Sequence, residues 1–486
     1  MRTNSALAGG RKISREDHVK LSQTLVTSAV IAALGGFLFG FDTVVISGAE
    51  QRLEQIFVPA ANLSPTWGRF WHGFLMASAL IGTVLGSLLV GKPCDRWGRR
   101  LVMFWLALLF LVSAVGSAFA WDWYSLVVFR FIGGLGVGGA SVVSPMYIAE
   151  ISPARCRGRL VALAQFNIVL GILLAYVSNL LISKYLVDAL ALDGSAWRWM
   201  FGMEAFPAAA YFLLLFFTPR SPRWLVAKGR DKEARHVLEL VGVDESVGSV
   251  DSELAEIRKS VDLEHHNLEE PFFQAKYAKP IMLAFTIAAF NQLSGINAVL
   301  YYSRRIFEYA GFGENAGLLN SVGLGLVNLV FTIVGMSLID HFGRKRLMIV
   351  GSLGYILSLG ATAWAFGTQQ TGAEGFTSLG SNVVFISLLA FIASHAVGQG
   401  AVIWVFIGEI FPNRVRARGL AFGCFIHWIF AAGISQTFPM IAEKAGGAIF
   451  AFYALCMIGQ LTWVLVKMPE TKGIPLEEIQ KRMGIE

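Results

Sequence analysis

One carboxylate lies in the middle of an apolar stretch near the start of the chain. Asp42, in GGFLFGFDTVVISG, is the only formally charged residue between Leu21 and Ala49. A carboxylate at the centre of a membrane helix costs about 2.5–3.5 kcal/mol, so it normally faces a cavity or a partner. Arg130 interrupts another apolar run, SLVVFRFIGGLG, and is the candidate partner. Burial raises the pKa of a carboxylate, whereas a nearby guanidinium lowers it. Because these two effects oppose each other, such a pair can bind and release a proton as its surroundings change. The alternative is a static ion pair.

Acidic and basic residues also recur in short polar segments between apolar runs. DRWGRR (95–100) is echoed by DHFGRKR (340–346), YIAEISPARCRGR (147–159) by FIGEIFPNRVRARG (406–419), and PRSPRWL (219–225) by MPETKG (468–473). Three paired motifs in the same order indicate a duplication, which is common in secondary transporters that bind substrate at the membrane midplane between two halves.

These motifs are expected to form a gate at one membrane surface. The expected pairs are Asp95 with Arg99, Glu150 with Arg157, Asp340 with Arg344 and Glu409 with Arg416, and the gate would also include Arg223 and Glu470. Such charged networks can bias a carrier between two states. The alternative is that the arginines only set the topology.

The composition is that of an all-α integral membrane protein. Of 486 residues, 55% are hydrophobic and only 15% are charged, against about 25% charged residues in soluble proteins. Apolar runs predict twelve membrane helices, near 24–48, 70–92, 100–120, 123–148, 160–183, 197–218, 278–302, 316–340, 346–367, 381–409, 418–441 and 446–468. They divide into halves at 24–219 and 278–468, joined by a polar helical linker at 220–277 and flanked by terminal segments 1–23 and 469–486.

Lys and Arg gather in the loops at 91–100, 150–160, 341–346 and 412–418. The positive-inside rule therefore places these loops, the linker and both termini in the cytoplasm. This distribution also accounts for the net charge of +7, so no nucleic-acid partner is implied. The four cysteines lack metal-binding spacing, and no nucleophile–base set, paired catalytic carboxylates or ATPase motif is present. We expect no enzyme activity, cofactor or metal, and transport driven by a gradient.

Nine motifs, from DRWGRR at 95–100 to PETKG at 469–473 and including NQLSGINAVLYY at 291–302, resemble those of the sugar porter family of the major facilitator superfamily, and the resemblance extends back to FGFD at 39–42. The resemblance implies two pseudo-symmetric six-helix halves and monosaccharide transport by alternating access. The chain looks most similar to bacterial proton-coupled symporters, such as those for xylose, and more distantly to glucose facilitators. An aspartate at the position of Asp42 accompanies proton coupling in that family, which implies that Asp42 is the coupling carboxylate and that Arg130 modulates it.

The resemblance also implies the sugar site. Amides can pair with sugar hydroxyls, and aromatic rings can cover the C–H face of a pyranose. The residues expected to contact the sugar or line its cavity are Gln165, Ile172, Asn291, Gln292, Asn297, Asn328, Trp404 and His427, with Phe39, Tyr301 and Trp428 lining or gating it. Gln292 and Asn297 share a helical face only if Gly295 loosens the turn. The alternative role for membrane amides is hydrogen bonding between helices.

Two departures from the family pattern stand out. Arg220 replaces a usual glutamate, and Gly400-Ala401 replaces Gly-Pro ahead of Trp404. The leading hypothesis is import of a monosaccharide (glucose, galactose, xylose or similar) with protons across a bacterial inner membrane, by a monomer in the lipid bilayer. A uniporter with a structural Asp42–Arg130 pair is the first alternative. A non-transporting sugar sensor is the second, disfavoured by the short segment after the last span.

Overall fold

The structure is a computed structural model, and it describes residues 22–485 except 62, 154–155, 188–193, 243–248, 268–269, 370–375, 413 and 475. Most of the expected N-terminal segment, residues 1–21, therefore lies outside the described residues. Twelve helices in the described part are long and apolar enough to cross a membrane, which confirms the predicted number. Among the described residues there is no β-strand.

The spans in the first half comprise α1 (Gln23–Ala60), α2 (Pro65–Leu89), α4 (Arg99–Ala118), α5 (Trp123–Ile151), α6 (Arg157–Leu181) continued by η1 (Ile182–Leu186), and α8 (Ala196–Gly202) with α9 (Ala205–Leu214) and η2 (Leu215–Phe217). Short α3 (Gly91–Trp97) joins α2 to α4. The first helix is longer than predicted, because it continues past residue 48 to Ala60 and carries charged side chains in its last three turns.

The spans in the second half comprise η3 (Ala275–Tyr277) with α13 (Ala278–Leu293) and α14 (Ile296–Tyr301), then α16 (Glu314–Phe342), α17 (Arg344–Gln369), and α18 (Ser378–His395) with η4 (Ala396–Gly400) and α19 (Ala401–Ile410). The last helix, α20 (Arg416–Val466), contains two spans, Arg416–Ala442 and Gly447–Val466. Short α15 (Ser303–Tyr309) follows α14.

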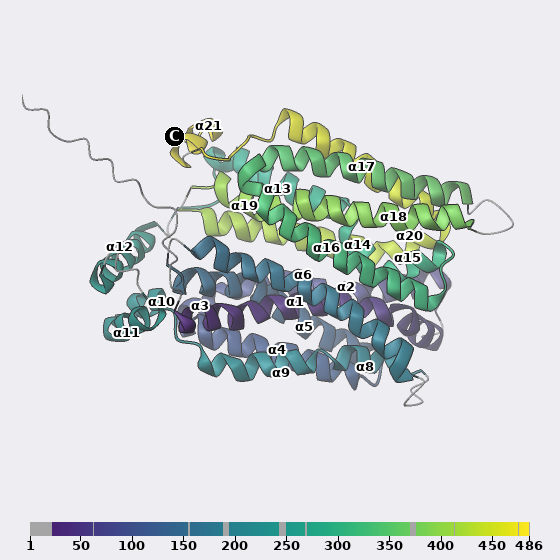
Figure 1. Cartoon of the computed structure of the whole chain (residues 1–486), viewed down its shortest axis with the longest axis horizontal. Coiled ribbons are helices and arrows are strands. Elements are labelled where there is room, and N and C mark those ends of the chain that lie inside the picture. The colour runs from purple at the N-terminus through teal and green to yellow at the C-terminus, as the bar shows by residue number, and fades with distance from the viewer. Residues whose placement is uncertain are drawn as a thin grey trace, which may run out of the picture.

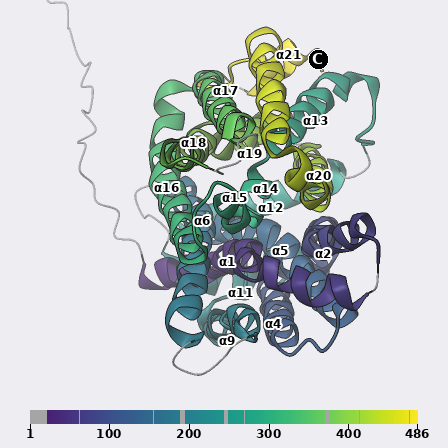
Figure 2. The ribbon, with the colours of Figure 1, turned by 90° about the vertical axis from the view of Figure 1, so that its right-hand side faces the viewer.

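The two sets of helices lie side by side, as Figure 1 and the turned view in Figure 2 show. The linker helices α10 (Pro222–Ala227), α11 (Asp231–Val241) and α12 (Val250–Asn267) project from one end of the bundle, here called the linker end. The C-terminal helix α21 (Leu476–Met483) lies at the same end (Figure 1). The opposite end, where α1 ends and α15 lies, is called the far end.

Glycines allow the helices of the first half to pack closely. A Cβ atom on Gly40 of α1 would lie 1.8 Å from the backbone oxygen of Ile168 on α6, and one on Gly134 of α5 would lie 1.9 Å from that of Ala79 on α2. Backbones approach this closely in membranes through small residues. These contacts hold α1 against α6 and α5 against α2, and a Cβ atom on Gly133 of α5 would lie 3.3 Å from Asp42 Oδ1.

Two spans of the second half are interrupted inside the membrane. Gly295, at φ +83°, separates α13 from α14, and glycine adopts this left-handed conformation without the penalty that a Cβ brings. Further along, the π-helical turn η4 lies between α18 and α19, so the Gly400-Ala401 departure leaves the helix bulged. Such bulges occur frequently at functional sites.

Candidate functional site

Asp42 and Arg130 form a buried ion pair between α1 and α5. Arg130 Nη1 donates to Asp42 Oδ1 at 2.5 Å, and its Nη2 donates to the backbone oxygen of Asp42 at 3.1 Å. Both side chains are 1% exposed, and the guanidinium also lies 5.4 Å from the ring of Phe201 on α8. The double attachment fixes the arginine on the helix that carries the carboxylate.

A second carboxylate, Glu204, joins this pair and was missed in the sequence analysis. Glu204 lies between α8 and α9, is 1% exposed, and reaches the Asp42 side chain within hydrogen-bonding range. Its Oε1 has no hydrogen-bond partner. The signal that could have found it is the same one that singled out Asp42, a lone carboxylate in the apolar run MFGMEAFPAAA.

The amides around the Gly295 break form a connected chain in the second half. Asn297 Nδ2 donates to Gln292 Oε1 at 2.7 Å, and Gln292 Nε2 donates to Asn291 Oδ1 at 3.0 Å. Gln292 Nε2 also lies 3.0 Å from Nε2 of His427 on α20. The left-handed glycine turns the chain so that Gln292 and Asn297, five residues apart, meet directly.

The chain continues through two amides that the sequence analysis did not single out. Asn291 Nδ2 donates to Oε1 of Gln399 in η4 at 3.3 Å, and Gln399 Nε2 donates to Gln460 Oε1 at 2.6 Å. Gln460 Nε2 then donates to Ser352 Oγ at 2.8 Å. Gln399 and Gln460 are completely buried. Three spans are thus tied to the amide cluster through η4.

The aromatic residues expected to line a cavity lie between the halves or beside the amides. Phe39 of α1 packs edge-to-face on Trp428 of α20, with ring centroids 5.7 Å apart. His427 lies 5.3 Å from the Trp404 ring of α19. Tyr301, 1% exposed on α14, is an electrostatic neighbour of both Arg130 and Asp42. The Phe39–Trp428 contact, and the core that Tyr301 shares with Phe41, thus bring α1 of the first half against α14 and α20 of the second.

The other expected sugar contacts lie on α6 and α16. Ile172 is buried in the hydrophobic core shared by the two halves, and Gln165 is half-buried on the same helix. Asn328 of α16 is 7% exposed, and its Oδ1 accepts from Thr332 Oγ1 at 3.4 Å. Within the described residues, neither Gln165 nor Asn328 is hydrogen-bonded to the amide chain.

Two of the four expected gate pairs are formed, and two are wrong. Arg99 lies 3.6 Å from Asp95, and Arg344 lies 3.5 Å from Asp340. Glu150 does not pair with Arg157, however: its Oε1 lies 2.9 Å from Arg99 Nη2. In the same way Glu409 pairs with Arg344 at 2.7 Å and not with Arg416.

The reason is the helix break that follows each glutamate. Arg157 and Arg416 are the first residues of the next helix, and their Nε atoms donate at 3.4 Å to the backbone oxygens of Ser152 and Phe411, where the preceding helices have ended. Terminal carbonyls lack partners inside the helix, so a neighbouring guanidinium satisfies them. Arg223 donates to Ser260 Oγ at 3.1 Å and lines a cavity with Glu150 and Arg157.

The duplicated halves differ at one charged position. Glu470 accepts hydrogen bonds from four backbone N–H groups, including those of Arg344 and Lys345 at the start of α17. Arg220 has the equivalent place in the first half and instead lies 3.6 Å from Glu233 of the linker. In the second half a carboxylate caps the start of α17, but the first half has no carboxylate at the equivalent position beside α4. Arg220, which occupies that position, is paired instead with Glu233 of α11.

By spacing, Glu50, Glu54 and His72 near the far end could hold a metal ion. A guanidinium already lies within reach of both carboxylates, because Arg305 of α15 contacts each of them. The site is therefore an ion-pair network formed by side chains of this protein.

Comparison with known proteins agrees with this architecture. The family model described as "Sugar (and other) transporter" matches residues 28–483. The D-xylose-proton symporter of Escherichia coli K12 is 35% identical over 94% of this chain and 96% of its own length, and the arabinose-proton symporter of Bacillus subtilis is 36% identical over 93% of each. The glucose transport protein of a Synechocystis strain is 36% identical over 92% of this chain and 95% of its own length.

The fold is also that of solved transporters. The partially occluded inward-open structure of the xylose transporter XylE from E. coli matches with a TM-score of 0.81 at 34% identity, covering 93% of this chain and all of that one. A structure of the same proton:xylose symporter bound to 6-bromo-6-deoxy-D-glucose matches with a TM-score of 0.78, and the match covers 95% of this chain and 99% of that one. The chain is thus a multi-pass membrane transporter and not an enzyme, and it belongs to the sugar porter family of the major facilitator superfamily.

Proposed function

We propose that this protein imports a monosaccharide, a hexose or pentose, together with a proton by alternating access. The observation that carries the proposal is the position of α14. Asn297 and Tyr301 lie four residues apart, on one face of this short helix. Asn297 belongs to the amide chain, and Tyr301 lies in the same buried core as Phe41, the residue before Asp42.

The acid–base group would carry the proton. Arg130 pairs with Asp42, and a second buried carboxylate, Glu204, lies next to Asp42, so these three side chains, here called the acid–base group, are electrically neutral when they hold one proton. Uncompensated charge inside a membrane is expensive, so the group's charge, and hence its proton, is coupled to whether the site is open to water. Asp42 is the coupling carboxylate, and Arg130 holds it in place and adjusts when the proton leaves.

The uncharged amide and aromatic side chains suit a substrate with hydroxyl groups and C–H faces. Gln292, Asn297 and Asn291, with Trp404 and His427 beside them, present donors, acceptors and flat rings without any net charge. Gln165 and Asn328 from α6 and α16 would complete the site. The relatives named for xylose, arabinose and glucose support a monosaccharide in general, and a particular sugar follows from none of them.

The charged motifs at the linker end would form the cytoplasmic gate. In this orientation the linker and both termini lie inside the cell. The protein would act as a monomer in a bacterial inner membrane. Within each half one arginine holds one glutamate, Arg99 with Glu150 and Arg344 with Glu409. The positive-inside rule supports this orientation because the arginine-rich loops are all at this end.

The test is proton uptake driven by sugar in liposomes. Wild type and Asp42→Asn are reconstituted, a panel of pentoses and hexoses is added, and external pH is followed beside radiolabelled counterflow. We expect wild type to alkalinise the medium with at least one sugar, and Asp42→Asn to retain counterflow without the pH change. Glu239→Gln on the exposed face of α11 is the matched control, since it also removes one carboxylate and should leave both signals intact.

Two results would contradict the proposal. Sugar movement without proton movement in wild type would make the protein a uniporter, with Asp42 and Arg130 as a structural pair. Sugar binding without any movement would make it a sensor.

A further inference from the structure

A buried ion-pair network joins the two halves at the far end. Arg305 of α15 makes two contacts with Glu50 of α1: Nη2 lies 2.7 Å from Oε1, and Nε donates to Oε2 at 3.1 Å. Arg305 also contacts Glu54, one turn further along α1. The Glu50 side chain is 1% exposed and that of Arg305 is 8% exposed. These charges are therefore screened little by salt.

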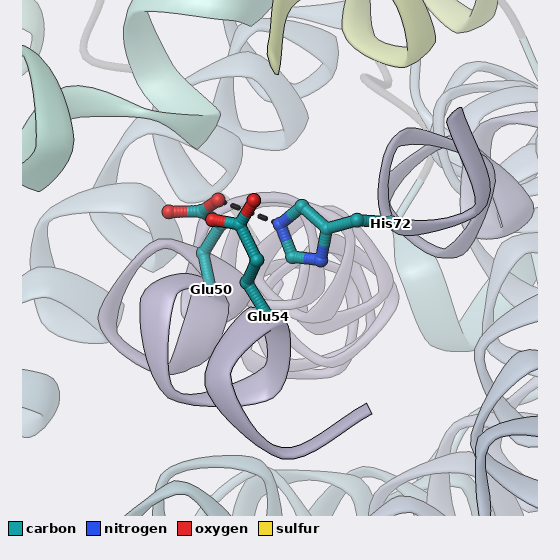
Figure 3. Close-up of side chains that lie close together, drawn as sticks. All are labelled: Glu50, Glu54 and His72. Carbon is teal, nitrogen blue, oxygen red and sulfur yellow. Dashed lines mark hydrogen bonds and ion pairs between the residues drawn. The ribbon is translucent and has the colours of Figure 1, made fainter. Parts of the chain in front are cut away.

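His72 of α2 completes the network from the first half. Its Nε2 lies 2.7 Å from Glu50 Oε1, the oxygen that also faces Arg305. Figure 3 shows the imidazole and the two carboxylates turned toward one another, with Glu50 and Glu54 on one helix and His72 on another. Because α1 and α2 both belong to the first half, His72 stays with Glu50 when the halves separate. Arg305 does not.

Two further bonds cross at the same place. Arg304 Nη1 donates to the backbone oxygen of Gly48 at 3.1 Å, and Gln51 Nε2 donates to Glu308 Oε2 at 2.5 Å. At the linker end, in contrast, the motif arginines Arg99 and Arg344 pair with glutamates of their own halves. Among the described residues, the ion pairs that join the two halves are thus concentrated at the far end.

We propose that Arg305, Glu50, Glu54 and His72 form an ionic lock that holds the far side of the carrier closed, and that its release is required for opening to that side. Arg305 is the cation that the second half inserts between two carboxylates of the first half. His72 is a positioning residue that holds Glu50 toward Arg305. The lock exists only when the halves meet at the far end, so it stabilises one state over the other, which is the condition for shifting a two-state equilibrium.

The lock is separate from the sugar site and the acid–base group. Glu50 lies eight residues after Asp42 on α1, or roughly 12 Å along the helix axis. Removing the lock should therefore change which state is populated without removing any residue assigned to sugar or proton binding. The proposal goes beyond the proposed function, since it holds whether or not protons are carried.

Distance measurements between the halves test the lock. Spin labels are placed at Thr66 and Asn315, exposed residues in the first turns of α2 and α16 at the far end, in a background with the four cysteines replaced by serine. Double electron–electron resonance is recorded in lipid nanodiscs without sugar. We expect a short distance in wild type, and in Arg305→Gln and Glu50→Gln a longer distance whose population relative to the short one rises at least tenfold.

Three variants make the result specific. Arg305→Lys should give an intermediate distribution, because one ammonium cannot bridge two carboxylates as a planar guanidinium does. Arg305→Gln combined with Glu50→Gln should shift the distribution about as far as either change alone, because both remove the same contact. Arg198→Gln is the matched control: this far-end arginine donates to the backbone oxygen of Ala118 in its own half, and its loss should leave the short distance intact.

A wild-type distance in folded Arg305→Gln and Glu50→Gln would overturn the proposal, as would a long distance in wild type or an equal shift in Arg198→Gln. If Arg305→Gln does not fold, Glu50→Gln and the double variant decide, since both avoid leaving two carboxylates without their cation. None of these readouts requires sugar or proton movement, so failure of the lock and failure of the proposed transport are distinguishable.

Discussion

Replacement of Glu470 by glutamine tests how the second half is held at the linker end. Glu470 Oε1 accepts from the backbone N–H groups of Arg344 at 3.0 Å, Thr471 at 2.9 Å and Lys472 at 3.0 Å, and its Oε2 accepts from that of Lys345 at 3.1 Å. The helix α17 starts at Arg344 after Gly343, which has no side chain to cap it. Glu470, more than 120 residues later in the sequence, supplies that cap.

The cost follows from the four contacts. Glutamine keeps one acceptor oxygen, but its NH₂ group would face the Lys345 N–H as a second donor. One hydrogen bond to a charged group is worth about 1.5–3 kcal/mol, and loss of negative charge at a helix N-terminus costs about 0.3–1 kcal/mol more. Because the site is only partly buried, water can replace some of the lost hydrogen bonding. We therefore expect the free energy of unfolding to fall by about 2 kcal/mol. For a chain of this length that is a fall of roughly 2 °C in apparent Tm.

The pH dependence has a definite sign. Partial burial of Glu470 opposes ionisation, but the backbone N–H groups outweigh it and hold its pKa below the ordinary value of 4.5. A carboxylate with a lowered pKa in the folded state contributes stability above its unfolded pKa and loses it as pH falls through the folded one. The difference between wild type and Glu470→Gln should therefore be full at pH 7 and shrink below pH 4.5.

Intrinsic tryptophan fluorescence during heating at a fixed scan rate measures the apparent Tm in detergent. Glu478→Gln on α21 is the control, since Glu478 is half exposed and its ion-pair partner among the described residues is Arg482, one turn away. It should change the Tm by less than about 1 °C. Equal Tm values for wild type and Glu470→Gln at pH 7, or a difference that persists undiminished at pH 3.5, would refute the capping account.

Three further changes give outcomes that the structure specifies. Arg220→Glu should raise the apparent Tm by about 1–2 °C, because it restores to the first half the helix-capping carboxylate that the second half has. Gly295→Ala should cost about 2–4 kcal/mol and abolish sugar binding measured by calorimetry, because its Cβ would lie 2.5 Å from the Tyr453 ring at a φ of +83°. Gln399→Leu should lower the Tm and weaken sugar binding about 3- to 10-fold, because it leaves the Gln460 amide buried without its partner.

Each of these has its own check. A fall in Tm for Arg220→Glu would mean that its pairing with the linker matters more than the cap. Gly433→Ala, at a helical glycine with open space around it, should be tolerated, and an equal loss there would remove the steric explanation for Gly295. Gln399→Leu combined with Gln460→Leu should recover part of the stability, since the Gln460 amide is then no longer left unpaired and only Asn291 Nδ2 loses its acceptor. Further loss would contradict the hydrogen-bond account.

Residue types and spacing were sufficient for the architecture. Lipid requires about 20 apolar residues per crossing and leaves no room for unpaired backbone, so hydropathy alone predicts the twelve spans that the structure contains. The paired motifs also indicated two related halves. Each motif lies at a helix end, where polar residues interrupt the apolar spans, so its repetition can be recognised in the sequence. Spacing also identified a break at Gly295 as the condition under which Gln292 and Asn297 could share a face, and the structure has a break there.

Partner choice was decided by the tertiary structure. Sequence spacing suggested Arg157 for Glu150 and Arg416 for Glu409, but the chain breaks between the members of each pair, and packing brings Arg99 and Arg344 to the glutamates instead. A helix period relates residues three and four apart on one helix and carries no information about which helix lies alongside.

The same limit explains what was missed. Glu204 lies more than 150 residues from Asp42 in the sequence, and Arg305 more than 250 from Glu50, so only the packing of the spans brings them together. The sequence by itself determined the membrane fold, its duplication and the chemical types of the interior residues, because these depend on composition and local period. The three-dimensional packing decided which buried charges lie together and which ones join the halves, because burial and distance exist only once the helices have met.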